Sequence, residues 1–248
     1  MSVRLLVSVR SVAEALLAAR GGADFIDLKE PARGALGGLP EDTLRAIVPA
    51  LRAHGHAQPV SATIGDLAPG EQAEILARVR RVAACGVDIV KVGIERGPGA
   101  GALLRALARS GTPLVPVFIA DRGLDERAVA LALGLGFAGV MLDTADKRGG
   151  SLFDALPAAA IARFVATARA AGVMVGLAGA LRREQAGRIA ALAPDFAGFR
   201  GAVCAGGERG AALDAGRLQT LAAAMRGAQA GGRGSPISSE RMRASSAR

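Results

Sequence analysis

A chain of 248 residues, 51% of them hydrophobic, is long and apolar enough to bury one large α/β core, which argues against a mostly disordered protein. The formal net charge of +9 comes from scattered basic residues, and the chain has no Trp or Tyr to stack on bases, so we expect no nucleic-acid partner. We also expect no membrane association, because the longest uncharged stretch, residues 128–142, is shorter than the roughly 18 apolar residues of a membrane span.

One alternation recurs eight times along the chain: a short β-branched run, a loop, and an amphipathic stretch rich in Ala and Leu. Such alternation predicts parallel strands joined by crossover helices. We expect strands over residues 5–9, 25–29, 60–64, 89–93, 114–119, 139–143, 173–177 and 196–200. A predicted helix follows each strand, over residues 11–20, 41–53, 71–84, 102–110, 126–133, 157–171, 183–192 and 215–226.

Eight such units predict an α/β fold with one domain, a (β/α)8 TIM barrel over residues 1–226. An open doubly wound sheet is the alternative, but no GxGxxG motif follows the first strand, so a closed barrel is favoured. Residues 227–248 are rich in Gly, Ser and Arg and are predicted to form a disordered basic tail.

Lysine is rare in this chain: of 31 basic residues, only Lys29, Lys91 and Lys147 are lysines. Lysine can become an amine nucleophile, whereas arginine cannot lose its proton. Lys29 ends the second predicted strand, Lys91 lies within the fourth, and Lys147 follows the sixth. Since the carboxyl ends of barrel strands form the active-site mouth, we predict that all three are catalytic. The alternative is an ordinary buried ion pair or a solvated loop charge, the commoner fate of a single lysine.

Two aspartates accompany these lysines. Asp27 lies two residues before Lys29, a spacing that puts both side chains on one face of a strand. Asp143 ends the sixth strand, four residues before Lys147. We predict that both carboxylates belong to the same site.

The loops after the seventh and eighth strands contain glycines, and barrels often bind phosphate there because backbone amides reach its oxygens. The alternative is chance, because the chain has 34 glycines. The predicted phosphate-binding residues are Gly179, Ala180, Arg200, Gly201, Gly206, Gly207 and Arg209. They predict a small phosphorylated substrate.

Other polar residues give weaker signals. His54 and His56 precede the third strand, at the opposite end of the barrel, and no acidic or histidine cluster has metal-ligand spacing. We therefore expect neither a metal nor an organic cofactor. Cys85 and Cys204 lack a CxxC pattern and are expected to be reduced thiols. We also expect the protein to be cytoplasmic and to form a homo-oligomer.

Five segments together resemble the (5-formylfuran-3-yl)methyl phosphate synthase family of methanofuran biosynthesis. They are IDLKEP (26–31), VSATIGD (60–66), VKVG (90–93), MLDT (141–144) and RGAVC (200–204). The likeness runs from about residue 5 to about residue 225 and keeps the motif order. It implies a β/α barrel that condenses two molecules of glyceraldehyde 3-phosphate into a phosphorylated hydroxymethyl-furancarboxaldehyde, with loss of phosphate and water.

The resemblance also implies roles for the candidate residues: Lys29 as the Schiff-base lysine, Lys91 as the proton acceptor, and Asp27, Asp143 and Lys147 as supporting acid/base groups. Archaeal members carry a further lysine near the end of the fifth strand, which residues 116–122 lack. Its role is either dispensable or taken by Arg122. The lysine-poor composition is typical of a bacterial chain and suggests a methylotroph.

Two other functions stay open. Another class I aldolase or triose-phosphate enzyme would share the lysine and the phosphate loops but would release a non-aromatic product. A basic nucleic-acid-binding or regulatory barrel would bind in a salt-sensitive way and would not depend on Lys29.

Overall fold

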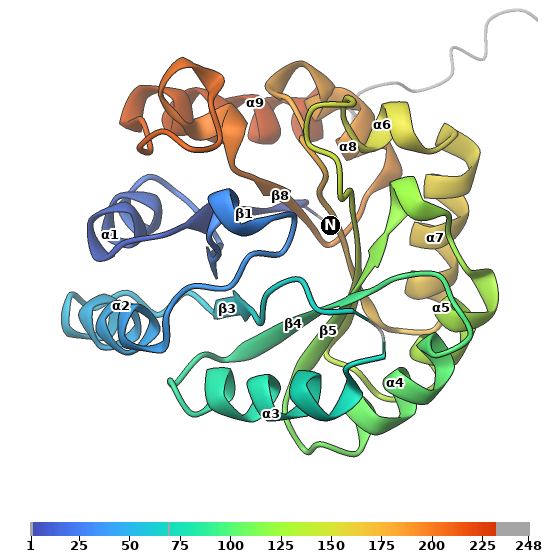
Figure 1. The fold of residues 1–248 in the computed structure, drawn as a ribbon. Coiled ribbons are helices and arrows are strands. Elements are labelled where there is room, and N and C mark those ends of the chain that lie inside the picture. The colour runs from blue at the N-terminus through green and yellow to red at the C-terminus, as the bar shows by residue number, and fades with distance from the viewer. Residues whose placement is uncertain (1, 69, 232–248) are drawn as a thin grey trace, which may run out of the picture.

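Eight parallel strands pair in sequence order, and β1 also pairs with β8, so that the sheet closes into a barrel. The computed structural model describes residues 2–68 and 70–231. Helices surround the strands as an outer ring (Figure 1). This arrangement confirms the predicted (β/α)8 barrel and excludes the open doubly wound sheet.

Most bounds agree with the predicted ones to within one or two residues. The strands are β1 (Arg4–Val9), β2 (Phe25–Leu28), β3 (Val60–Thr63), β4 (Ile89–Ile94), β5 (Leu114–Ile119), β6 (Gly139–Asp143), β7 (Met174–Leu177) and β8 (Phe196–Phe199). The helices are α1 (Val12–Arg20), α2 (Glu41–Ala53), α3 (Gln72–Ala83), α4 (Ala100–Ala108), α5 (Glu126–Leu133), α6 (Leu152–Ala155), α7 (Ala158–Ala170), α8 (Ala186–Leu192) and α9 (Ala215–Gly231).

Three elements differ from the expectation. The short helix α6 was not predicted, and Ser151 begins it by donating its amide hydrogen to Asp154 (2.7 Å). The predicted helix over residues 183–192 starts as a 3-10 turn, Arg183–Gln185, before α8. Helix α9 continues to Gly231 rather than ending at 226, and the rest of the predicted tail, 232–248, lies outside the described residues.

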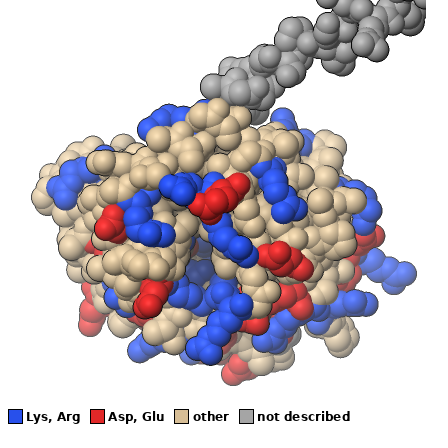
Figure 2. All heavy atoms as spheres, turned by 90° about the horizontal axis from the view of Figure 1, so that it is seen from above, with Lys and Arg blue, Asp and Glu red and all other residues tan. Residues whose placement is uncertain are grey.

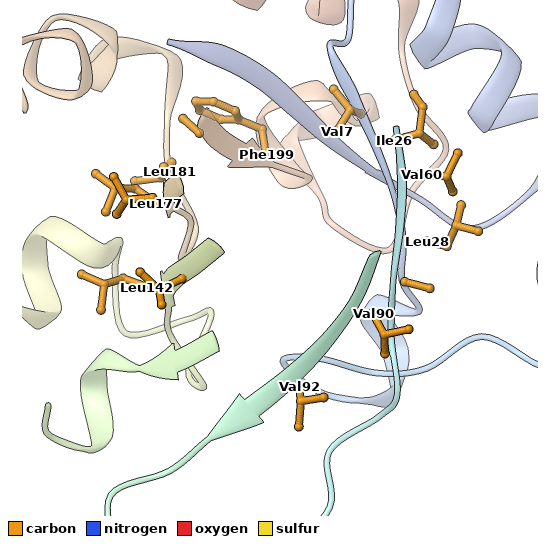
Figure 3. Close-up of a cluster of buried hydrophobic side chains, with 14 of the residues drawn as sticks. Val7, Ile26, Leu28, Val60, Val90, Val92, Leu142, Leu177, Leu181 and Phe199 are labelled. Atoms are coloured by element: carbon orange, nitrogen blue, oxygen red, sulfur yellow. The ribbon is translucent and has the colours of Figure 1, made fainter. Parts of the chain in front are cut away.

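The main hydrophobic core lies between the strands and the ring of helices. Every second strand residue points outward into it, among them Val7, Ile26, Val90 and Leu142 (Figure 3). Apolar helix residues such as Leu44 complete this layer, which explains why the helices have one apolar face.

The inward residues of the strands change from apolar to polar toward the carboxyl ends. A second cluster, which includes Phe25, Met141 and Phe196, fills the barrel interior. Two residues further along β2 and β6 stand Asp27 and Asp143, both buried. Because inward residues recur at every second position, a polar layer lies next to the apolar cluster, on the side of the strands' carboxyl ends.

Candidate active site

The polar inward residues line a cavity of about 730 Å³. It contains all five residues predicted to be catalytic: Asp27, Lys29, Lys91, Asp143 and Lys147. Figure 2 shows a hollowed face of the molecule on which Lys and Arg side chains gather in and around the hollow. A concave site with several cationic side chains suits a small anionic ligand.

One ion pair in the cavity joins β2 to β4. Lys91 Nζ lies 2.6 Å from Asp27 Oδ1, and the two side chains are almost fully buried. Burial alone would raise the pKa of Asp27, but the positive charges of Lys91 and Lys29 hold this pKa below its usual value. Burial also lowers the pKa of Lys91, an effect that the Asp27 charge opposes and the Lys29 charge reinforces. Lys91 therefore gives up its proton more readily than an exposed lysine.

A second group is centred on Asp143, whose carboxylate holds two lysines. Lys29 Nζ lies 3.3 Å from Oδ2, and Lys147 Nζ donates to Oδ1. The amide of Thr144 donates to the same Oδ1 (2.8 Å). Burial would raise the pKa of Asp143, but the two lysines hold it far below its usual value. Burial and the Lys29 charge lower the pKa of Lys147 against the opposing effect of Asp143.

The predicted phosphate loops reach the cavity in part. Gly179, Ala180, Arg200, Gly201, Gly207 and Arg209 line it, whereas Gly206 is exposed and is not part of the lining. Within the described part of the chain, the amides of Ala180, Gly201 and Ala202 donate to no protein acceptor. Free amides along a cavity wall can bind an anion.

Gly179 is required by the shape of its loop. Its φ is +105°, and a Cβ at this position would lie 2.9 Å from Cγ2 of Thr144. A side chain would therefore strain the backbone and push the loop away from the Asp143 segment.

Arg200 does not present a free guanidinium, as a phosphate ligand would. Its guanidinium pairs with Glu14 (2.6 Å) and also donates to the carbonyl oxygens of Ser8, Arg209 and Ala211. These contacts use all of its donors, so Arg200 holds the loop after β8 instead of presenting a free charge. The side chain of Arg209, by contrast, makes one hydrogen bond within the described residues, to the carbonyl of Gly34 (3.0 Å).

Sequence reasoning missed two serines beside the lysines. Ser8 Oγ and Ser61 Oγ donate to Asp27 Oδ2 (2.9 Å) and Oδ1 (2.8 Å), respectively. Both are buried polar residues at inward positions of their strands. A serine at an inward strand position is visible in the sequence and indicates a polar partner, because a hydroxyl in the barrel interior needs one.

The remaining polar candidates lie away from the cavity or lack partners. His54 is exposed and contacts the Ala50 carbonyl at the end of α2. Across residues 2–68 and 70–231, no group of three or more His, Cys, Asp or Glu side chains is arranged to hold a metal ion. The helices in these ranges include none that is long and apolar enough to cross a membrane.

The fold and this cavity define a β/α-barrel protein with a buried site of lysines and carboxylates at the carboxyl ends of its strands. The model of the 4-HFC-P synthase family matches residues 5–222, and the chain belongs to that family. The resemblance of the five sequence segments is thereby confirmed.

Named relatives match most of the chain. The (5-formylfuran-3-yl)methyl phosphate synthase of Methanopyrus kandleri is 36% identical over 84% of this chain and 92% of its own length. A protein of Methylorubrum extorquens, provisionally given the same name, is 42% identical over 90% of this chain and 92% of its own. Since these relatives are named as synthases, the chain belongs to a family of enzymes.

Solved structures confirm the fold class alone. Phosphoribosyl anthranilate isomerase from Thermus thermophilus superposes with a TM-score of 0.63 at 19% identity, over 90% of this chain and 98% of that one.

Proposed function

We propose that this enzyme condenses two molecules of glyceraldehyde 3-phosphate into the phosphate ester of 4-(hydroxymethyl)-2-furancarboxaldehyde, for methanofuran or an analogue. One inorganic phosphate and two water molecules leave, which balances the atoms. The observation that carries the proposal is the convergence of Lys29, Lys91 and Lys147 with two carboxylates in one cavity. Family membership supports the choice of substrate.

Lys29 is the proposed nucleophile. Its amine attacks the carbonyl carbon of one triose, and loss of water gives an iminium that withdraws electrons from the neighbouring carbon. Asp143 lies 3.3 Å from Lys29 and bonds Lys147 on its other oxygen. Lys147, with its lowered pKa, delivers the proton that departs with the water.

Lys91 is the proposed proton acceptor. A lysine can take a proton from carbon only while its amine is neutral, and burial lowers the pKa of Lys91. Proton loss from the iminium gives an enamine, whose carbon forms the new bond to the aldehyde of the second triose. Ring closure and the eliminations of water and phosphate then give the aromatic furan and free Lys29.

Phosphate recognition is assigned to the loops after β7 and β8. The free amides of Ala180, Gly201 and Ala202 supply neutral donors, and Arg209 supplies a positive charge with unused donors. Arg200 acts indirectly by holding the second loop.

The test is to trap the imine. The protein is incubated with glyceraldehyde 3-phosphate and borohydride, and the adduct is weighed and mapped by mass spectrometry. We expect a triose-sized adduct on Lys29 that is absent in Lys29→Arg and present in Lys147→Arg, because arginine keeps the charge but cannot form an imine.

Absorbance in the ultraviolet completes this test, since the furan product is aromatic. An adduct at Lys29 without an absorbing product favours another class I aldolase acting on triose phosphates. Consumption of substrate with no adduct at any lysine contradicts the Schiff-base mechanism.

A further inference from the structure

The carboxylate of Asp27 is shared among three side chains rather than given to one lysine. Its Oδ1 accepts from Ser61 Oγ (2.8 Å) and pairs with Lys91 Nζ (2.6 Å), while its Oδ2 accepts from Ser8 Oγ (2.9 Å). All four residues are buried, with exposed fractions between 1% and 6%. Because these side chains are shielded from water, each hydrogen bond to the Asp27 carboxylate is stronger than it would be in solvent.

Strand register sets this arrangement. Ser8 on β1 is the direct neighbour of Asp27 on β2, and Asp27 is the direct neighbour of Ser61 on β3. Side chains at paired inward positions of adjacent strands lie side by side. The two hydroxyls therefore flank the carboxylate from both sides, and no loop movement is needed to bring them there.

We propose that Ser61 and Ser8 are positioning residues that take up part of the negative charge of Asp27 and so allow Lys91 to release its proton. A hydroxyl that donates to a carboxylate spreads its charge and leaves less to hold the neighbouring ammonium. Without these two hydrogen bonds, the full negative charge of Asp27 attracts the ammonium group of Lys91. The buried lysine then keeps its proton and accepts none from substrate.

Ser61 gives the cleaner test because it does not line the cavity, whereas Ser8 does. Among the described residues the Ser61 hydroxyl bonds Asp27 and not Lys91, so it acts on Lys91 through that carboxylate. Thr63 is a stringent control: it is buried on β3 and is the register neighbour of Lys91, but its hydroxyl donates to the carbonyl of Gly37 (2.9 Å) instead of to Asp27.

The three lysines allow a direct measurement. Lysine labelled with 13C at Cε gives one signal for each of Lys29, Lys91 and Lys147, and Lys91→Arg identifies its own signal by removing it. We expect the titration midpoint of Lys91 to rise by about half a unit to one unit in Ser61→Ala and in Ser8→Ala. In Thr63→Val it stays at the wild-type value, and in Ser61→Thr the hydroxyl restores it.

The reaction offers a second readout that rests on the proposed function. If Lys91 must be neutral, the acid limb of the pH profile of kcat/KM shifts upward with the Lys91 midpoint in the two alanine variants but not in Thr63→Val. A wild-type protein that forms no furan contradicts the proposed function alone, because the NMR titration needs no substrate.

The proposal is overturned by a Lys91 midpoint that stays or falls in both alanine variants while their circular dichroism matches the wild type. Should either alanine variant fail to fold, Ser61→Cys keeps the volume with a weaker donor. It should give a smaller shift of the same sign, and an unchanged midpoint there rejects the proposal as well.

Discussion

Lys29 Nζ lies 3.3 Å from Oδ2 of Asp143, although the two residues are 114 positions apart in the sequence. The contact crosses the barrel interior from the end of β2 to the end of β6. Because Lys147 bonds the other oxygen, one carboxylate orients two amines. Asp143 is therefore the group on which the geometry of the proposed nucleophile depends.

Replacing Asp143 by asparagine should lower the rate of furan formation by about 100-fold, since a neutral amide cannot hold two ammonium groups in place. The rate is measured from product absorbance under saturating substrate. Asp146→Asn is the control, because Asp146 is exposed and its carboxylate accepts hydrogen bonds only from its own loop. Equal rates in the two variants would contradict the role of Asp143.

Arg209→Ala should raise KM for glyceraldehyde 3-phosphate by about tenfold or more, with a smaller change in kcat, because a charged phosphate contact binds substrate before and during reaction. Steady-state kinetics provide the measurement. Arg127→Ala, an exposed change on α5, should leave KM as it is. A KM unaffected by loss of Arg209 removes this arginine from the phosphate site.

Glu14→Gln should lower the free energy of unfolding by about 3 kcal/mol, because it leaves the guanidinium of Arg200 buried without its counter-charge. Urea titration gives the value. The matched variant Glu41→Gln breaks exposed pairs with Arg45 and Arg81 and should cost at most about 1 kcal/mol. Similar losses of unfolding free energy in both variants would show that the buried Glu14–Arg200 pair contributes no more than exposed pairs do.

Acid should destabilise the protein through its buried carboxylates. The folded pKa of Asp143 lies below the usual aspartate value of 3.8, so its contribution to stability is complete above about pH 3.8 and is lost as the pH falls toward the folded pKa. Urea midpoints measured from pH 6 downward should fall more steeply below this value in the wild type than in Asp143→Asn. Parallel curves would contradict the contribution of Asp143.

The local pattern of the sequence determined the architecture and the chemical type of the site. Strand and helix periods are properties of neighbouring residues, so eight repeats of one pattern suffice to predict the barrel. The scarcity of lysine pointed to Lys29, Lys91 and Lys147 because only lysine combines a cation with a potential amine nucleophile. Neither conclusion depends on which strands are neighbours in the barrel or on their register.

Only the tertiary structure decided which charges pair. Asp27 and Lys29 share one strand face, yet Asp27 pairs with Lys91 and Lys29 with Asp143. Likewise, Arg200 contacts Glu14 of the first helix instead of standing free for phosphate. Partners across a closed barrel are set by strand register, curvature and the length of each side chain, and spacing along the sequence contains none of these quantities.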